Sequence, residues 1–304
     1  MKIIAPAYYN SFACIASRCK HSCCVGWEVD IDEESVARYT EMSHPYAENI
    51  RSSIDGETPH FKLTRGDRCP HLDASGLCKI ITECGEETLC QICRDHPRYR
   101  NYYDDVVEIG LGLSCEEAAR IALSADTGFI ASDSEDMTDA INFSEYPAEL
   151  FSEEERPLAN EKKRLISLVN NRSLTIEKRI DALLPTRPDV HEVKALYLSL
   201  EILDAEWKSR LNFISAENFS RNLEKNADLI ERMLCAFIYR HVSCESFYMP
   251  RTMAAFAALS ALVVSALSES LENFADTLRA YSAEIEYSTE NTERVLDFLE
   301  QQMT

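Results

Sequence analysis

The residues best suited to chemistry in this chain are cysteines, and they crowd toward one end. The first group reads C-x4-C-x3-C-C, from Cys14 through Cys19 to the adjacent pair Cys23 and Cys24. Six more follow up to Cys115, so ten of the twelve cysteines lie in the first 115 residues. Thiols at this density have three ordinary explanations, which are disulfide bonds, structural zinc and an iron–sulfur cluster.

The expected compartment argues against disulfides. Residues 1–12 contain a proline and no apolar run of signal-peptide length, so we expect a cytoplasmic protein. The cytoplasm is reducing, and disulfide frameworks are rare there. Metal ligation is therefore the leading interpretation of the cysteines.

The spacing of the cysteines favours an iron–sulfur cluster and leaves zinc as the alternative. Zinc sites are typically built from two C-x2-C pairs, and only Cys90 and Cys93 form such a pair. Cluster ligands bind different iron atoms, so irregular spacings and the Cys-Pro step at Cys69 are compatible with a cluster. The adjacent Cys23 and Cys24 are awkward ligands for one tetrahedral ion.

Four cysteine-containing segments together resemble a known family. They read C-x4-C-x3-C-C-x-G-W, C-P-H-L-D-x-x-G-L-C-x-I, C-x-x-C-R-D-H-P-R and L-S-C-E-E-A-A-R, within residues 8–123. As an ordered set they resemble the flagellin lysine-N-methylase family, within a wider group of zinc- or iron-chelating Cys-cluster proteins.

The resemblance implies methyl transfer from S-adenosylmethionine (SAM) to lysine ε-amines of flagellin, with a [4Fe–4S] cluster held by the cysteines. Four thiolates suffice for one cluster, and the sequence does not select among the candidates. Cys84 and Cys90 are additions of this chain, and no motif marks the SAM site. The cysteines at motif positions, which are the predicted metal ligands, are Cys14, Cys19, Cys23, Cys24, Cys69, Cys78, Cys93 and Cys115.

Other classes of function remain open on the residues alone. The cysteines are compatible with a non-enzymatic zinc- or iron–sulfur-binding interaction module, and with an electron-transfer role. The C-x3-C-x2-C triplet of radical SAM enzymes and the G-x-G-x-x-G of dinucleotide-binding folds are both absent.

Two further groups of side chains have a functional and a structural interpretation. His21 and His71 lie within the cysteine motifs, where each could replace a thiolate or only hydrogen-bond near the site. A lysine amine, with a pKa near ~10.4, must lose its proton before methylation. A group of tyrosines and aspartates just past the last motif cysteines could line a pocket for it, although an exposed loop is the commoner setting for such residues. These are Tyr99, Tyr102, Tyr103, Asp104 and Asp105.

Charge and hydropathy exclude two classes of partner. The formal charge of −21 argues against nucleic acid, whose phosphates need an excess of Lys and Arg. It suits a basic partner, or serves solubility. The most apolar stretch, Thr252–Leu271, is rich in Ala and Ser and is predicted to be a buried helix, so no membrane partner is expected.

Short elements are predicted around the cysteines. Asp73–Gly76 has turn chemistry that would bring Cys69 opposite Cys78. The other expected elements are a strand over Val25–Ile31, a helix capped by Asp32 or Asp30 and running to about Met42, a strand over Val106–Ile109 and a helix over Cys115–Leu123.

The sequence predicts helices in the later part of the chain. Apolar residues recur there every three or four positions, as at Leu196, Leu200, Leu203 and Trp207. Nine acidic and no basic residues between Asp133 and Glu155 indicate a linker. We therefore expect a mainly α protein in which an N-terminal Cys-rich metal-cluster region with short strands (1–125) packs on a C-terminal helical bundle (161–304), after an acidic linker (126–160).

Overall fold

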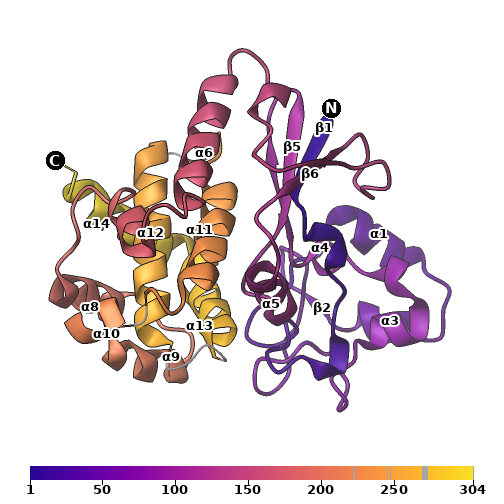
Figure 1. Cartoon of the computed structure of the whole chain (residues 1–304). Coiled ribbons are helices and arrows are strands. Elements are labelled where there is room, and N and C mark those ends of the chain that lie inside the picture. The colour runs from indigo at the N-terminus through magenta and orange to yellow at the C-terminus, as the bar shows by residue number, and fades with distance from the viewer. Residues whose placement is uncertain (222, 245, 247, 269–272, 304) are drawn as a thin grey trace. The chain divides into compact units, whose positions relative to one another are not determined.

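The computed structural model describes residues 1–221, 223–244, 246, 248–268 and 273–303 (Figure 1). These residues divide into two compact units. The first, called here the helical unit, comprises Met1–Phe12, Arg100–Ser114 and Ala118–Thr304. The second, called the cysteine unit, comprises Ala13–Tyr99 and Cys115–Glu117. The cysteine unit is thus an insertion between the first strand of the chain and the remainder.

A mixed sheet forms one part of the helical unit. In the described residues its five strands lie in the order β4-β5-β1-β6-β7. Strand β1 is parallel to β5, with Ile4 opposite Glu108, and antiparallel to β6. A parallel pair needs a long crossover connection, and the cysteine unit lies within it. The strands are β1 (Lys2–Pro6), β4 (Arg98–Tyr102), β5 (Val106–Leu111), β6 (Phe129–Ser132) and β7 (Ile141–Phe143).

Helices make up most of the rest of the helical unit, so the mainly helical prediction is confirmed, with the sheet as an addition to it. In Figure 1, α6, α11 and α12 lie side by side, and each pair of them is in contact. The helices are α5 (Glu116–Ser124), α6 (Arg156–Val169), α7 (Ile176–Asp181), α8 (Val190–Ser199), α9 (Ala205–Arg210), α10 (Ala216–Arg221), α11 (Ala227–His241), α12 (Pro250–Leu267), α13 (Phe274–Tyr281) and α14 (Thr289–Gln301).

Helix α12 is the core of this bundle. Within the described residues it alone has the length and apolarity of a membrane span, but 89% of that window is buried inside the fold. Pro250 begins it, where a missing N–H costs no hydrogen bond. The prediction of a buried helix from Thr252 is confirmed to Leu267, and residues 269–271 of the predicted stretch lie outside the described residues.

A buried ion pair joins the sheet to the helices. Lys162 of α6 donates to both carboxylate oxygens of Glu108 on β5, at 2.7 and 2.6 Å, and both side chains are fully buried. Tyr103 and Tyr146 donate their hydroxyls to the same carboxylate. Lys162 also donates to the carbonyl of Tyr239 on α11. Burial lowers the pKa of Lys162, and the adjacent carboxylate opposes that effect.

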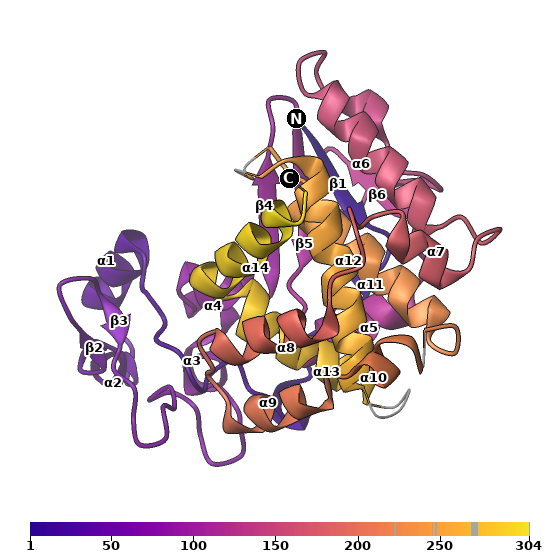
Figure 2. The same cartoon turned by 90° about the vertical axis from the view of Figure 1, so that its left-hand side faces the viewer.

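The cysteine unit contains little regular structure. Its elements are α1 (Glu33–Glu41), α2 (Ala47–Arg51), β2 (Ile54–Asp55), β3 (His60–Phe61), α3 (Lys79–Cys84) and α4 (Gln91–Asp95). Helices α1 and α2 lie beside the β2–β3 hairpin (Figure 2), and Tyr39, Ile50 and Phe61 from these elements share one apolar core. Asp32 caps α1 by accepting from the Ser35 N–H, as predicted.

Some sequence predictions of local structure are wrong. Val25–Ile31 forms no strand, because Gly26 adopts a φ of 94° and only single bridges form, at Val25 and Asp30. The expected stripe from Leu196 to Trp207 is interrupted, because α8 ends at Ser199 and Leu203 is 64% exposed.

The two units also differ from the blocks 1–125, 126–160 and 161–304 expected from the sequence. The acidic stretch contributes β7 to the sheet, because apolar residues between the charges, such as Tyr146 and Phe151, are buried while most of the carboxylates face outward. Strand β1 and strand β5, both N-terminal in sequence, belong to the helical unit.

Replacing Lys162 by Met should destabilise the protein by about 3–5 kcal/mol, because it leaves Glu108 buried without its cation. Urea unfolding followed by circular dichroism measures the change. Lys163→Met is the matched control, since Lys163 pairs with Glu145 near the surface and should cost less than about 1 kcal/mol. Equal losses for the two variants would contradict a structural role for the buried pair.

Candidate metal centre

The structure gathers all eight predicted metal ligands into the cysteine unit. Cys14 to Cys93 lie in its main segment, and Cys115 joins them through the short segment Cys115–Glu117. All twelve cysteines are free thiols. Cys235 and Cys244 lie apart from these, in the helical unit. Which of the eight bind a metal stays a prediction.

Cys24 lies between two other cysteines, Cys23 and Cys69. It accepts hydrogen bonds from the thiols of Cys23 and Cys69, and these bonds lower the pKa of Cys24 to about 3. The same bonds raise the pKa of both donors. A backbone hydrogen bond of 2.8 Å from Cys69 N to the Cys24 carbonyl holds the two segments together. A thiolate is the form in which cysteine binds metal, so Cys24 is poised as a ligand.

Cys90 and Cys93 form a second thiol pair. Cys90 is fully buried at the N-cap of α4, and the hydrogen bond from the Cys93 thiol lowers its pKa. The nearby charges of Cys24 and Cys69 help to raise the pKa of Cys93. Cys90 was not among the predicted ligands. The C-x2-C spacing is the sequence signal that points to it.

Cys78 lies close to this pair. It forms an isolated bridge with Leu72 across the predicted Asp73–Gly76 turn. Burial raises its pKa, and the charges of Cys24 and Cys90 contribute. Cys78 and Cys93 both pack against the apolar core that contains Cys90.

Glu116, at the start of α5, accepts two hydrogen bonds from the loop Cys14–Cys24. Its carboxylate accepts from the Lys20 N–H at 2.8 Å and from the Cys19 thiol at 3.6 Å. Burial, with this carboxylate nearby, raises the pKa of Cys19 to about 11. The charge of Cys115 makes a smaller contribution to the raised pKa values of Cys19 and Cys23.

His71, one of the two histidines within the cysteine motifs, has a structural role. The two ring nitrogens of His71 contact the Tyr46 hydroxyl at 3.0 Å and the Ser53 hydroxyl at 2.9 Å. Burial lowers its pKa to about 4, so the ring is neutral at physiological pH. Of the two interpretations of His71, the structure supports hydrogen bonding and packing.

The cysteines have the donor atoms that a metal centre needs, but their side chains are not arranged around a bound ion. Within the described residues, no three His, Cys, Asp or Glu side chains are placed around a common point as a bound ion requires. Soft thiolates nevertheless are the donors that zinc and iron–sulfur clusters select. Metal binding displaces the thiol protons that form the present S–H···S bonds, so the donor set suits such a group.

The tyrosines and aspartates after the last motif do not gather around one pocket. Tyr102, Asp104 and Asp105 are exposed, whereas Tyr103 is buried and donates to Glu108. The loop interpretation therefore holds for Asp104 and Asp105, whereas Tyr102 is an exposed residue at the end of β4 and Tyr103 serves the buried ion pair.

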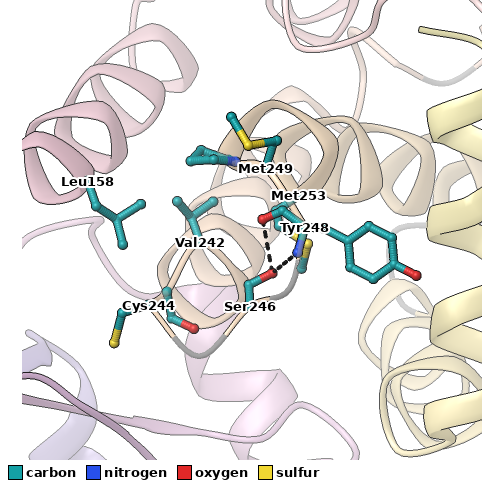
Figure 3. A pocket seen from close by; sticks show the side chains of 9 residues that line it. Leu158, Val242, Cys244, Ser246, Tyr248, Met249 and Met253 are labelled. Atoms are coloured by element: carbon teal, nitrogen blue, oxygen red, sulfur yellow. Dashed lines mark hydrogen bonds between the residues drawn. The ribbon is translucent and has the colours of Figure 1, made fainter. Parts of the chain in front are cut away.

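A cavity of about 270 Å³ lies in the helical unit (Figure 3). Leu158, Val242 and Met253 supply part of its apolar wall. Ser246 exchanges hydrogen bonds with the backbone of Tyr248, and the Cys244 thiol donates to the Tyr102 carbonyl at 3.0 Å. The cavity wall is therefore partly polar and partly apolar, and its Ser246 and Cys244 side chains are engaged by the backbone.

Comparison with known proteins bears out the resemblance to lysine-N-methylases. Over 190 residues the chain is 25% identical to the lysine-N-methylase of Salmonella typhimurium (strain LT2), covering 60% of this chain and 46% of that protein. The Salmonella choleraesuis lysine-N-methylase matches to the same extent. The chain is also 28% identical over 123 residues to the flagellar biosynthetic protein FliU of Salmonella muenchen, covering 38% of this chain and 73% of that protein.

The chain therefore spans about half the length of the lysine-N-methylases that it matches. No family model matches, so the wider Cys-cluster group is not shown. No solved structure matches either.

In reduced, metal-free protein, the exposure of each thiol should determine how fast it is alkylated. Cys14 and Cys244 are exposed and should be alkylated first by iodoacetamide. Cys69 and Cys235 are buried with raised pKa values, so they are shielded and hold little thiolate, and should react at least tenfold more slowly. Peptide mass spectrometry over a time course measures the order. Equal rates for Cys14 and Cys69 would refute this placement of Cys69.

Proposed function

We propose that this chain is a protein lysine N-methyltransferase that acts on flagellin with SAM as methyl donor. The observation that carries the proposal is the similarity, over 190 residues, to proteins named lysine-N-methylase. The FliU similarity supports a flagellar substrate, because that relative is named as a flagellar biosynthetic protein.

The proposed cofactor is a [4Fe–4S] cluster, with zinc as the alternative metal. Its ligands would come from the eight motif cysteines, all of which lie in the cysteine unit as free thiols. When bound, a cluster would supply thiolate-ligated iron that can either bind SAM at an open iron position or only shape its pocket. The thiolate of Cys24 favours binding of such a group.

The proposed reaction is a nucleophilic substitution at carbon. The lysine amine gives up a proton to a base, and its lone pair then forms a bond to the methyl carbon of the sulfonium. The carbon–sulfur bond breaks with its electrons on sulfur, which leaves S-adenosylhomocysteine and methyl-lysine. Because an ordinary lysine has a pKa near ~10.4, the site must favour the neutral amine.

The charge of the chain suits this substrate class. A formal charge of −21 creates a negative field that attracts a lysine-bearing surface before the amine is deprotonated. The attraction is screened by salt over about 8 Å at physiological ionic strength, so it assists encounter more than the chemical step.

Anaerobically purified protein should bind SAM in calorimetric titration and transfer labelled methyl groups to flagellin. Tryptic mass spectrometry should place the label on lysines as additions of 14 Da per methyl group. Flagellin whose lysines have been acetylated is the matched control and should accept none, because acetylation removes the nucleophilic amine. Stoichiometric zinc with no SAM binding and no methyl transfer would refute the enzyme and favour a zinc-stabilised interaction module.

A further inference from the structure

We propose that the edge of strand β7 (Ile141–Phe143) is a docking surface for an extended, lysine-bearing segment of a partner protein. The segment would pair with β7 as an added strand, which is a recurring way in which proteins bind extended peptides. The inference deepens the proposed function and rests on it for the choice of a lysine-bearing protein as the partner.

Strand β7 has one side without a strand beside it. Within the described residues it is the last strand of the sheet and pairs only with β6. At the opposite end of the sheet, β4 contacts the end of α11 and the segment after it. Asn101 donates to the Arg240 carbonyl, and the Cys244 thiol donates to a carbonyl of β4. No such bond reaches β7 from the described residues outside the sheet, so its edge is open to an incoming chain.

The pairing register leaves the backbone of Asn142 directed away from the sheet. The Ala7 N–H donates to the Gly128 carbonyl at 2.9 Å, so every second residue counted from Gly128 bonds toward β1. The residues of β6 between these bond toward β7, where their partners are Ile141 and Phe143. Asn142 lies between those two partners. Its N–H and C=O therefore point outward, as pairing with an added strand requires.

An exposed apolar side chain lies on this strand. Successive side chains alternate between the two faces of a strand, so Ile141 and Phe143 share one face of β7. Ile141 is 62% exposed, and Phe143 is half-buried. A strand laid beside β7 would place a side chain of its own against these two residues and bury them further.

The loop before β7 supplies carboxylates for a basic partner. Asp136 and Asp139 are exposed, and neither forms an ion pair within the described residues. Asp136 accepts from the hydroxyls of Ser134 and Thr138, at 2.6 and 2.9 Å. Asp139 accepts from the Ser132 hydroxyl. These bonds hold both carboxylates in place beside the strand, where a lysine ammonium of the partner can pair with them.

Charge selects a basic partner over a second copy of this chain. Charged residues beside a short edge strand keep like-charged chains from pairing with it. Nine acidic and no basic residues lie between Asp133 and Glu155, and the whole chain carries a formal charge of −21, so two copies repel each other at this edge. The same carboxylates attract a chain that carries lysines.

The test is peptide binding by the full chain, with neither SAM nor flagellin present. The probe is a fluorescently labelled, end-capped peptide of alternating lysine and valine, because valine favours an extended chain. Fluorescence anisotropy should show saturable binding that weakens as salt is added. The same peptide with acetylated lysines is the control. It should bind about tenfold more weakly, because acetylation removes the charge.

Asn142→Pro should weaken binding of the lysine peptide about tenfold, because proline has no N–H to donate to an added strand. Asn142→Ala is the matched control, since it removes the same side chain, keeps the N–H and should bind like the wild type. The Asn142 N–H points away from β6, so proline should leave the sheet intact, which circular dichroism checks. If Asn142→Pro does not fold, the double variant Asp136→Asn with Asp139→Asn replaces it. That variant should bind more weakly and with less dependence on salt.

Equal binding of the acetylated peptide, or wild-type affinity in a folded Asn142→Pro protein or in the double aspartate variant, would overturn the inference. Dimerisation that Asn142→Pro abolishes would also overturn it, because the edge would then belong to a second copy. Peptide binding without methyl transfer would refute the proposed function and leave the docking surface standing. Methyl transfer to flagellin without peptide binding would do the reverse.

Discussion

The ion pair between Glu108 and Lys162 determines how the helical unit is assembled, because a charge buried without its partner is costly. Glu108 faces Ile4 in the register of β5 and β1, and Lys162 comes from α6. Tyr239 of α11 closes the network, since its carbonyl accepts from Lys162 and its hydroxyl donates to the Ile4 carbonyl. The main segment of the cysteine unit follows β1 and precedes β5 in the chain. Both of these strands are therefore held by the same ion pair and hydrogen bonds that hold the helices.

The cysteine unit depends on a different kind of interaction. Its helices are short, and its apolar core is small. Small domains of this kind usually gain stability from metals or disulfides. Because its thiols are free, metal binding would add free energy directly to folding. If these cysteines bind a metal, a variant that removes a ligand would therefore change both the metal site and the stability of the unit.

Local signals in the sequence predicted local structure well. Asp32, a predicted cap, is the residue at which α1 begins, and the apolar run at Val106 correctly predicted β5. The sheet was not predictable in the same way, because β1 pairs with strands more than 100 residues later. The candidate ligands were chosen by motif. Their mutual contacts were not predictable in that way, because Cys24 and Cys69 are 45 residues apart in sequence and only the fold brings their backbones together.

Exposure separates the cysteines of this unit by what each could do. A centre that binds a small molecule needs a coordination position open to solvent, whereas a structural centre is closed by protein ligands. Cys69 is only 8% exposed and Cys90 is fully buried, so these two thiols suit a closed, structural setting. Cys14 and Cys23 are exposed. A small molecule would therefore reach the thiols of Cys14 and Cys23 before those of Cys69 and Cys90.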